Sequence, residues 1–190
     1  MSRAGSGFLA YFYFDFKDTE KQGLHAFLSS ILLQLSGQSD IFFDTLFSLY
    51  SAHENGSKAP TDNSLAMCLK DILTKGQLPI YLVMDALDEC PNDSGIPSPR
   101  EKVLDLLEEI IELHHPNLRL CITSRPEYDI RTILDPLATQ QVSLHHESGQ
   151  KEDITTYVTS VVHSDRKMRK WRDDDKNMVV EKLTEKADGM

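Results

Sequence analysis

An apolar run that ends in three acids is the feature that most constrains the fold of this 190-residue chain. Residues 79–84 read Pro-Ile-Tyr-Leu-Val-Met, and Asp85, Asp88 and Glu89 follow within five positions. A short continuous apolar run is typical of a strand buried on both faces of a parallel sheet. Such a strand carries the residues that follow it to the carboxyl edge of the sheet, where open α/β folds bind their ligands.

The spacing of these acids suggests a separate role for each position. A carboxylate at the strand end, such as that of Asp85, can hold Mg²⁺, because this ion keeps several waters and takes few protein ligands. Acids three and four residues later, here Asp88 and Glu89, can polarise an attacking water. The pattern therefore predicts metal-assisted hydrolysis, and an ordinary acidic turn after a strand is the structural alternative.

A second apolar run, at 118–122, ends in Thr123, Ser124 and Arg125. An arginine at a strand end is often a surface ion-pair partner. Two consecutive strands with an acidic and a basic ending nevertheless fit a nucleotide site, in which Arg125 would sense a γ-phosphate. If the two strands are parallel neighbours, we expect Arg125 to lie close to the acids that follow residue 84.

Helical periodicity separates the expected strands, and this alternation predicts an α/β fold with a parallel sheet. Ser98, Pro99 and Glu101 form a capping-box pattern that predicts a helix start. Apolar residues at three- and four-residue intervals predict helices around 24–35, 41–50, 65–72 and 103–111, and two polar-rich helices follow around 154–162 and 176–187. We expect strands at 9–16, buried on both faces, and at 80–85 and 119–123, paired in that order. A last short strand at 140–144 would either slide across to the sheet or hang loosely beside it.

Composition excludes several classes of function. The formal net charge of −10 disfavours nucleic acid and anionic membranes as partners, because both attract a positive field. Cys68, Cys90 and Cys121 are an odd number at wide spacings, which disfavours a disulfide framework and a zinc site and indicates a reducing, cytoplasmic location. Cys90 directly follows the acidic pair, whose carboxylates would suppress its thiolate, so we expect a structural role for it. No apolar run is of membrane-spanning length.

The chain resembles the NACHT domains of the signal-transducing P-loop NTPases, in the form found beside nephrocystin-like and fungal incompatibility proteins. The blocks that carry the resemblance are LAYFYFDF at 9–16, DALDEC at 85–90, TSRP at 123–126, DITTYV at 153–158 and ADGM at 187–190. The resemblance implies a three-layer P-loop NTPase-like parallel sheet flanked by helices, with strand order five-one-four-three-two. The block at 85–90 then corresponds to a Walker B motif.

By the same resemblance, Asp85 would coordinate Mg²⁺, Glu89 with Asp88 would activate water, and Arg125 would act as the sensor arginine. The implied ligand is ATP or GTP with Mg²⁺, and the implied partners are proteins or further copies of the chain, bound through NACHT surfaces. Such modules are conformational switches in signalling.

One departure from the family pattern concerns phosphate binding. A P-loop reads G-x-x-x-x-G-K-[ST], and this sequence contains none. Ala4-Gly5-Ser6-Gly7 is a weak echo, because Phe8 and Leu9 follow it in place of Lys and Ser. We therefore expect a chain truncated after the Walker A motif and lacking the first strand, with 1–8 as a lead-in, 9–146 as a partial nucleotide-binding core and 147–190 as a helical extension.

The missing loop leaves three hypotheses for function. The first is a partial NACHT-type NTPase module that binds nucleotide weakly by itself, because positioning of the phosphates supplies nearly all of phosphoryl-transfer catalysis. The second is a non-enzymatic interaction or scaffold module that keeps the fold without the chemistry. The third is a different hydrolase that uses Asp85, Asp88 and Glu89 as a two-metal site.

Overall fold

The computed structural model describes residues 7–93, 95–143 and 148–187. The chain divides into two compact units, Met1–Ala138 and Thr139–Met190. The sequence alone suggested a boundary at 146.

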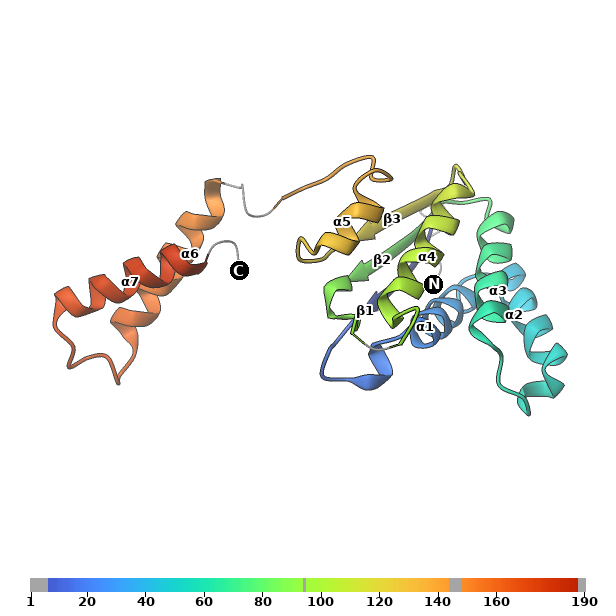
Figure 1. Cartoon of the computed structure of the whole chain (residues 1–190), viewed down its shortest axis with the longest axis horizontal. Coiled ribbons are helices and arrows are strands. Elements are labelled where there is room, and N and C mark those ends of the chain that lie inside the picture. The colour runs from blue at the N-terminus through green and yellow to red at the C-terminus, as the bar shows by residue number, and fades with distance from the viewer. Residues whose placement is uncertain (1–6, 94, 144–147, 188–190) are drawn as a thin grey trace. The chain divides into compact units, whose positions relative to one another are not determined.

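A three-stranded parallel sheet forms the centre of the first unit (Figure 1). Its strands are β1 (Phe8–Tyr13), β2 (Ile80–Asp85) and β3 (Leu118–Ile122). They lie in the order β1-β2-β3, with Ile80 opposite Phe8 on one side and Leu118 on the other. The predicted pairing of the three strands, and the α/β class with a parallel sheet, are confirmed.

Helices connect the strands where the periodicity predicts them. Three helices lie between β1 and β2, namely α1 (Leu24–Ser36), α2 (Asp40–Ala52) and α3 (Asp62–Lys75). Between β2 and β3 lies α4 (Pro99–Glu112), which begins at the predicted capping box. A short helix that the periodicity did not predict, α5 (Tyr128–Leu134), follows β3. Single turns of 3₁₀ helix lie at Thr19–Lys21, Glu54–Gly56 and Leu87–Glu89.

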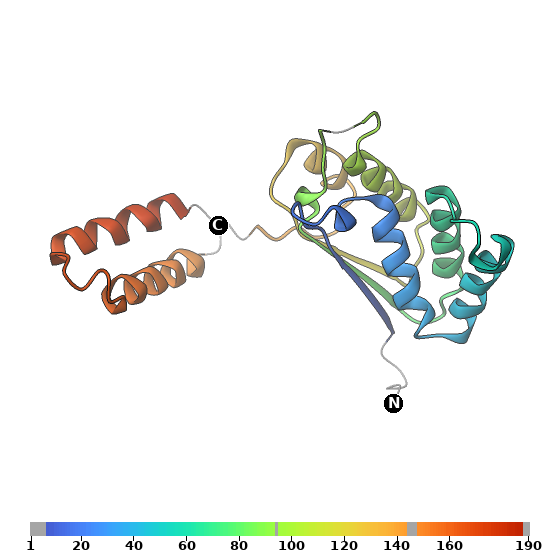
Figure 2. The same cartoon turned by 90° about the horizontal axis from the view of Figure 1, so that it is seen from below.

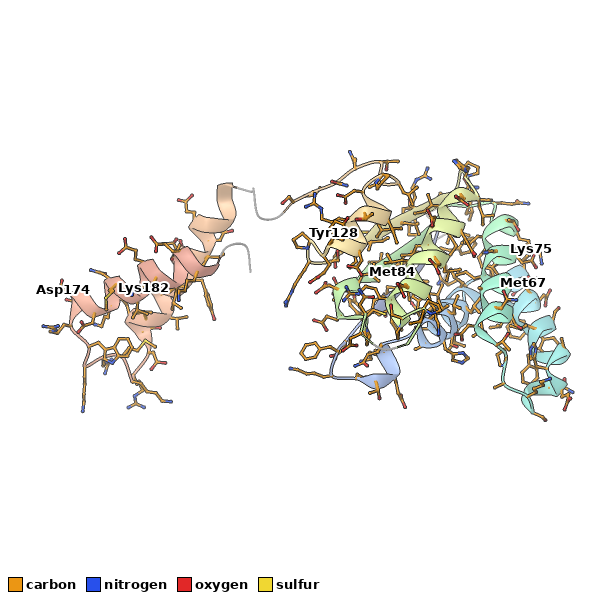
Figure 3. All side chains as sticks on the ribbon, viewed as in Figure 1. Met67, Lys75, Met84, Tyr128, Asp174 and Lys182 are labelled. Atoms are coloured by element: carbon orange, nitrogen blue, oxygen red, sulfur yellow. The ribbon has the colours of Figure 1, made fainter. Side chains whose placement is uncertain are left out.

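These four longer helices gather on one face of the sheet (Figures 1 and 2). The reason is chirality: both crossovers step in the same direction across the sheet, and right-handed crossovers then place their helices on the same side. The core lies between this face and the helices. It is built from fully buried side chains of the sheet, α1, α3 and α4, such as Ala10, Leu82, Met84, Phe27, Ile31, Leu69, Val103 and Leu107. Figure 3 labels Met84 in the sheet.

Two predictions, the burial of β1 on both faces and the three-layer arrangement, are wrong for the opposite face of the sheet. The first strand ends at Tyr13, and Leu9, Tyr11 and Tyr13 are each about half exposed while Ala10 and Phe12 are buried. The strand thus alternates between its two faces and is not buried on both. Within the described part of the first unit, no helix layer covers this face, so the three-layer arrangement is present only as two layers.

The predicted strand at 140–144 is also wrong over its described part, because residues 140–143 have no strand structure and Leu144 lies outside the described residues. The second unit instead consists of two helices, α6 (Ser148–Ser164) and α7 (Asp173–Ala187), in the regions predicted to be helical. They pack against each other, and Val162 is buried there. Figure 3 labels Asp174 and Lys182 on α7. None of the helices in the described parts of the chain combines the length and the apolar character that crossing a bilayer requires.

Candidate functional site

A tight turn at the carboxyl end of β2 places the acidic residues. Ala86 adopts the left-handed backbone conformation, with φ 55° and ψ 48°, and a single turn of 3₁₀ helix over Leu87–Glu89 follows it. Thr123, just after β3, holds this turn: its Oγ1 accepts from the Ala86 amide at 3.1 Å and donates to Oδ1 of Asp85. The Leu87 amide donates to the Thr123 carbonyl at 3.0 Å. The ends of β2 and β3 are therefore fixed to each other.

Asp88 and Arg125 form the central ion pair of this edge. The backbone amide of Arg125 donates to Oδ1 of Asp88 at 2.9 Å, and the side-chain Nε of Arg125 lies 3.4 Å from Oδ2 of Asp88. The Asp88 side chain is 10% exposed, whereas the Arg125 side chain is 73% exposed. Asp88 thus uses both oxygens to orient Arg125, and the outer nitrogens of the guanidinium remain accessible to an anion.

The remaining two acids each keep one free oxygen. Oε2 of Glu89 accepts from the Phe16 amide at 3.2 Å, which connects the acidic turn to the segment after β1. Asp85 accepts from Thr123 through Oδ1 only. Among the described residues, neither Oδ2 of Asp85 nor Oε1 of Glu89 has a hydrogen-bond partner. These two oxygens are the ones available to a ligand.

A buried arginine that no sequence pattern indicated supports the acidic turn through hydrogen bonds to its backbone. Arg100, the second residue of α4, is 8% exposed. Its Nη2 donates to the Asp88 carbonyl at 2.6 Å and its Nε donates to the Cys90 carbonyl at 2.8 Å. Its Nη1 pairs with Asp129 at 3.2 Å, and Asn92 also donates to that carboxylate at 2.9 Å. The arginine therefore links the turn after β2 to α5, which follows Arg125.

A cleft of about 730 Å³ opens at this edge. Four acids and two arginines line it, so its charge is negative overall and a free phosphate would be repelled unless a cation accompanied it. Its lining residues are Phe16, Gln22, Asp88, Glu89, Cys90, Pro91, Asn92, Asp93, Arg100, Arg125 and Glu127. Asp85 is not among them and lies beside the cleft, not within it.

The residues at this edge fit Mg²⁺ better than they fit a metal with an all-protein ligand set. Nowhere in the described ranges do three or more His, Cys, Asp or Glu side chains gather as metal ligands. Mg²⁺ keeps most of its waters and is typically held by one or two carboxylates together with substrate phosphates. The free Oδ2 of Asp85 meets that requirement, whereas a two-metal centre at Asp85, Asp88 and Glu89 finds no support in this geometry.

Cys90 has the structural position expected for it, although the physical cause differs from the predicted one. The residue is fully buried, and its Sγ donates to the Gln22 carbonyl at 3.2 Å. Burial raises the pKa of its thiol to about 11, and the nearby Arg100 opposes the shift. Desolvation, not the neighbouring carboxylates, therefore keeps Cys90 protonated.

The structure thus brings all four predicted site residues to one edge of one sheet, as expected for parallel neighbours. Asp88 pairs with Arg125, and along the chain Asp85 precedes and Glu89 follows Asp88 in the same turn. Of the supporting residues, Thr123 belongs to the TSRP block but had no predicted role, and Arg100 and Asp129 belong to none of the blocks that carry the resemblance. The only local signal for Arg100 is its place inside the Ser98–Glu101 capping box, and that box indicates a helix start, not a contact with the acidic turn.

Comparison with known proteins identifies a family for this chain. No curated protein and no solved structure matches it. Residues 2–125, about two thirds of the chain, match the family described as nephrocystin 3, N-terminal. The matched region ends at Arg125 and so includes the sheet, α1 to α4 and all four predicted site residues. The chain therefore belongs to the nephrocystin 3 N-terminal family.

Proposed function

We propose that this chain is a partial NACHT-type module whose carboxyl edge binds a nucleoside triphosphate with Mg²⁺ and thereby acts as a signalling switch. The observation that carries the proposal is the Asp88–Arg125 pair at the ends of adjacent parallel strands, with an exposed guanidinium and the free oxygens of Asp85 and Glu89 beside it. Parallel α/β sheets bind ligands at this edge.

Each side chain has a distinct part in this proposal. Asp85 would hold Mg²⁺ through Oδ2 and intervening water, and the ion would supply charge neutralisation for the phosphates. Arg125 would contact the terminal phosphate, with Asp88 fixing its orientation. Glu89, whose Oε1 is free, is better placed than Asp88 to polarise a water, because both Asp88 oxygens already accept from Arg125 or pair with it.

Binding by the chain alone should be weak. The sequence contains no G-x-x-x-x-G-K-[ST] segment, so backbone amides and a lysine are not available to hold the phosphates. The cleft itself is acidic. We expect a dissociation constant no tighter than about 1 mM, equivalent to about −4 kcal/mol, for Mg-ATP and Mg-GTP.

NMR titration of the chain with Mg-ATP and Mg-GTP tests this function. The amides of Asp85, Glu89 and Arg125 should shift at millimolar nucleotide, and Asp85→Asn should weaken the response several-fold. Asp105→Asn is the matched control, because Asp105 is exposed on α4 and has no partner among the described residues. No shift at the three amides would contradict the nucleotide site, and micromolar binding would contradict the weak affinity.

A second candidate function, a non-enzymatic interaction module, is favoured by one specific observation. All three carboxylates already accept hydrogen bonds within the chain, from Thr123, from Arg125 and from the Phe16 amide. These bonds connect the ends of the three strands without any ligand. The titration above distinguishes the candidates, since an interaction module retains the fold and gives no nucleotide response.

A further inference from the structure

The two edges of the sheet differ in how their backbone groups are satisfied. In β1, the Phe8 amide donates to the Pro79 carbonyl at 2.7 Å and the Phe14 amide donates to the Asp85 carbonyl at 3.1 Å. Even-numbered residues therefore face β2. In a strand, alternate residues direct their backbone groups to opposite sides, so Leu9 and Tyr11 direct theirs away from the sheet.

Gln34 of α1 and Gln38 in the turn directly after this helix satisfy these outward-facing groups. Gln38 Oε1 accepts from the Leu9 amide at 3.0 Å, and its Nε2 donates to the Leu9 carbonyl at 2.7 Å. Gln34 does the same for Tyr11, accepting from the amide at 3.1 Å and donating to the carbonyl at 2.8 Å. Each side-chain amide thus makes the pair of hydrogen bonds that a directly opposite residue of an antiparallel neighbouring strand would make.

The match follows from the dimensions of helix and strand. Four residues of α-helix rise about 6.0 Å, and two residues of parallel strand advance about 6.6 Å. Gly37, just after α1, keeps helical geometry (φ −72°, ψ −6°), and the Gln38 amide donates to the Leu35 carbonyl at 3.0 Å. The turn therefore continues the rise of the helix, and the two glutamines stand opposite residues two apart on β1. The helix also holds the side chains in place, because Gln34 Nε2 donates to Ser30 Oγ at 3.0 Å and Gln38 Nε2 donates to the Gln34 carbonyl at 2.8 Å.

We propose that Gln34 and Gln38 form an edge cap that prevents a second copy of this chain from adding its strand to β1. A strand edge with free amides and carbonyls is a template for pairing with another chain. β1 is prone to such pairing, because its sequence Phe-Leu-Ala-Tyr-Phe-Tyr is uncharged and rich in residues that favour strands. The cap occupies the groups that a second copy of β1 would need.

The other edge of the sheet has no comparable cap. The Thr123 amide donates to the Met84 carbonyl, so odd-numbered residues of β3 face β2 and Leu120 and Ile122 face outward. Within the described ranges, the outward backbone groups of Leu120 and Ile122 have no hydrogen-bond partner. The sheet is therefore closed to strand addition at β1 and open at β3.

The double variant Gln34→Met with Gln38→Met tests the proposal, because methionine matches the length of glutamine, and at Gln34 in α1 also its helix propensity, but lacks the amide. At low concentration, the Leu9 and Tyr11 amides should exchange at least about tenfold faster than in the wild type. The Ala10 and Phe12 amides, which face β2, should keep their protection. At high concentration, sedimentation velocity should detect self-association.

Gln77→Met with Gln140→Met is the matched control, because both glutamines are exposed and neither side chain has a hydrogen-bond partner in the described residues. The control adds the same two methionines without opening an edge. Unchanged protection of Leu9 and Tyr11 in the test variant, or self-association equal to that of the control, would overturn the proposal. If the double variant loses protection at Ala10 and Phe12 and so does not fold, Gln38→Met alone decides by the same two measurements at Leu9.

Discussion

Ala86 shows how one residue at the candidate site is held in an unfavourable conformation. Its φ of 55° lies in the left-handed region, which costs an L-residue roughly 1–2 kcal/mol. The Thr123 hydroxyl and carbonyl hold the turn by accepting from the Ala86 and Leu87 amides. This backbone reversal is what directs Asp88 toward Arg125. Strain of this kind persists only where surrounding contacts determine it.

Ala86→Gly should therefore stabilise the chain. Glycine reaches positive φ without steric cost, although it loses more entropy on folding, so we expect a net gain of about 0.5–1 kcal/mol in the free energy of unfolding. Denaturant unfolding measures it. Ala26→Gly, in the first turn of α1, is the control and should lose roughly 0.5–1 kcal/mol. A loss at Ala86→Gly equal to that at Ala26→Gly would contradict this account of the turn.

The two buried thiols predict how stability changes with pH. Burial raises the pKa of Cys68 and of Cys90 from 9.0 to about 11, with Asp71 adding to the effect at Cys68. Between pH 9 and 11 the unfolded chain has released these protons and the folded chain has not, so the free energy of unfolding falls as pH rises through this window.

Comparison of variants isolates this contribution from that of other groups. Cys68→Ala and Cys90→Ala should each show a shallower fall in the free energy of unfolding between pH 9 and 11 than the wild type. Cys121→Ala is the control, because Cys121 is exposed and its thiol meets water in both states. Equal slopes in all four proteins would show that the buried thiols do not keep their protons in this range.

At the scale of elements, the residues that cap the start of α4 also bond to the loop that follows the acidic turn. Ser98 Oγ accepts from the Glu101 amide at 3.1 Å, while the Ser98 amide donates to Oε2 of Glu101 at 2.6 Å. Ser98 Oγ also donates to Oδ1 of Asn92 at 2.8 Å, and Asn92 in turn donates to Asp129. The helix cap is thus part of the network that supports the acidic turn.

Ser98→Ala should lower the free energy of unfolding by more than the loss of an ordinary helix cap does. We expect a loss of about 2 kcal/mol in the free energy of unfolding, because the variant breaks both the cap and the bond to Asn92. Thr61→Ala is the matched control: Thr61 caps α3 through the Ser64 amide at 3.2 Å and should cost about 1 kcal/mol. Equal losses in the two variants would show that the bond from Ser98 to Asn92 adds nothing to stability beyond the cap of α4.

At the scale of the whole molecule, the sheet of the first unit is asymmetric. Its helices cover one face, and the other face carries half-exposed side chains of β1 and β2, among them Tyr11 and Tyr81. One edge is capped by Gln34 and Gln38, and the outward groups of Leu120 and Ile122 leave the other edge open. Any element that extends this sheet would therefore pair with β3.

Hydrogen exchange on the unmodified chain should report the same asymmetry. The outward amides of Leu120 and Ile122 should exchange at least about tenfold faster than the outward amides of Leu9 and Tyr11, because only the latter have a hydrogen-bond acceptor. The inward amide of Cys121 provides the internal control. Strong protection across all of β3 would mean that another segment pairs with its edge.

Much of the fold follows from the sequence by itself, because local patterns determine it. Apolar spacing set the helices α1 to α4, and the Ser98–Glu101 capping box set where α4 begins. The chemistry at the two strand ends placed the acids and Arg125 at one edge, since parallel neighbours share their direction. These features depend on residue type and spacing alone, and the family match covers the same region.

Only the tertiary structure decided how the site and the sheet are completed. The pairing of Asp88 with Arg125, the support from Arg100 and the glutamine cap join segments that are 12 to 37 residues apart, and each depends on loop paths that no local pattern encodes. The prediction that β1 is buried on both faces is wrong for the same reason. An apolar strand has the same sequence pattern whether helices cover one of its faces or both. Which face is covered depends on the handedness and direction of the crossovers, and these are properties of the assembled sheet.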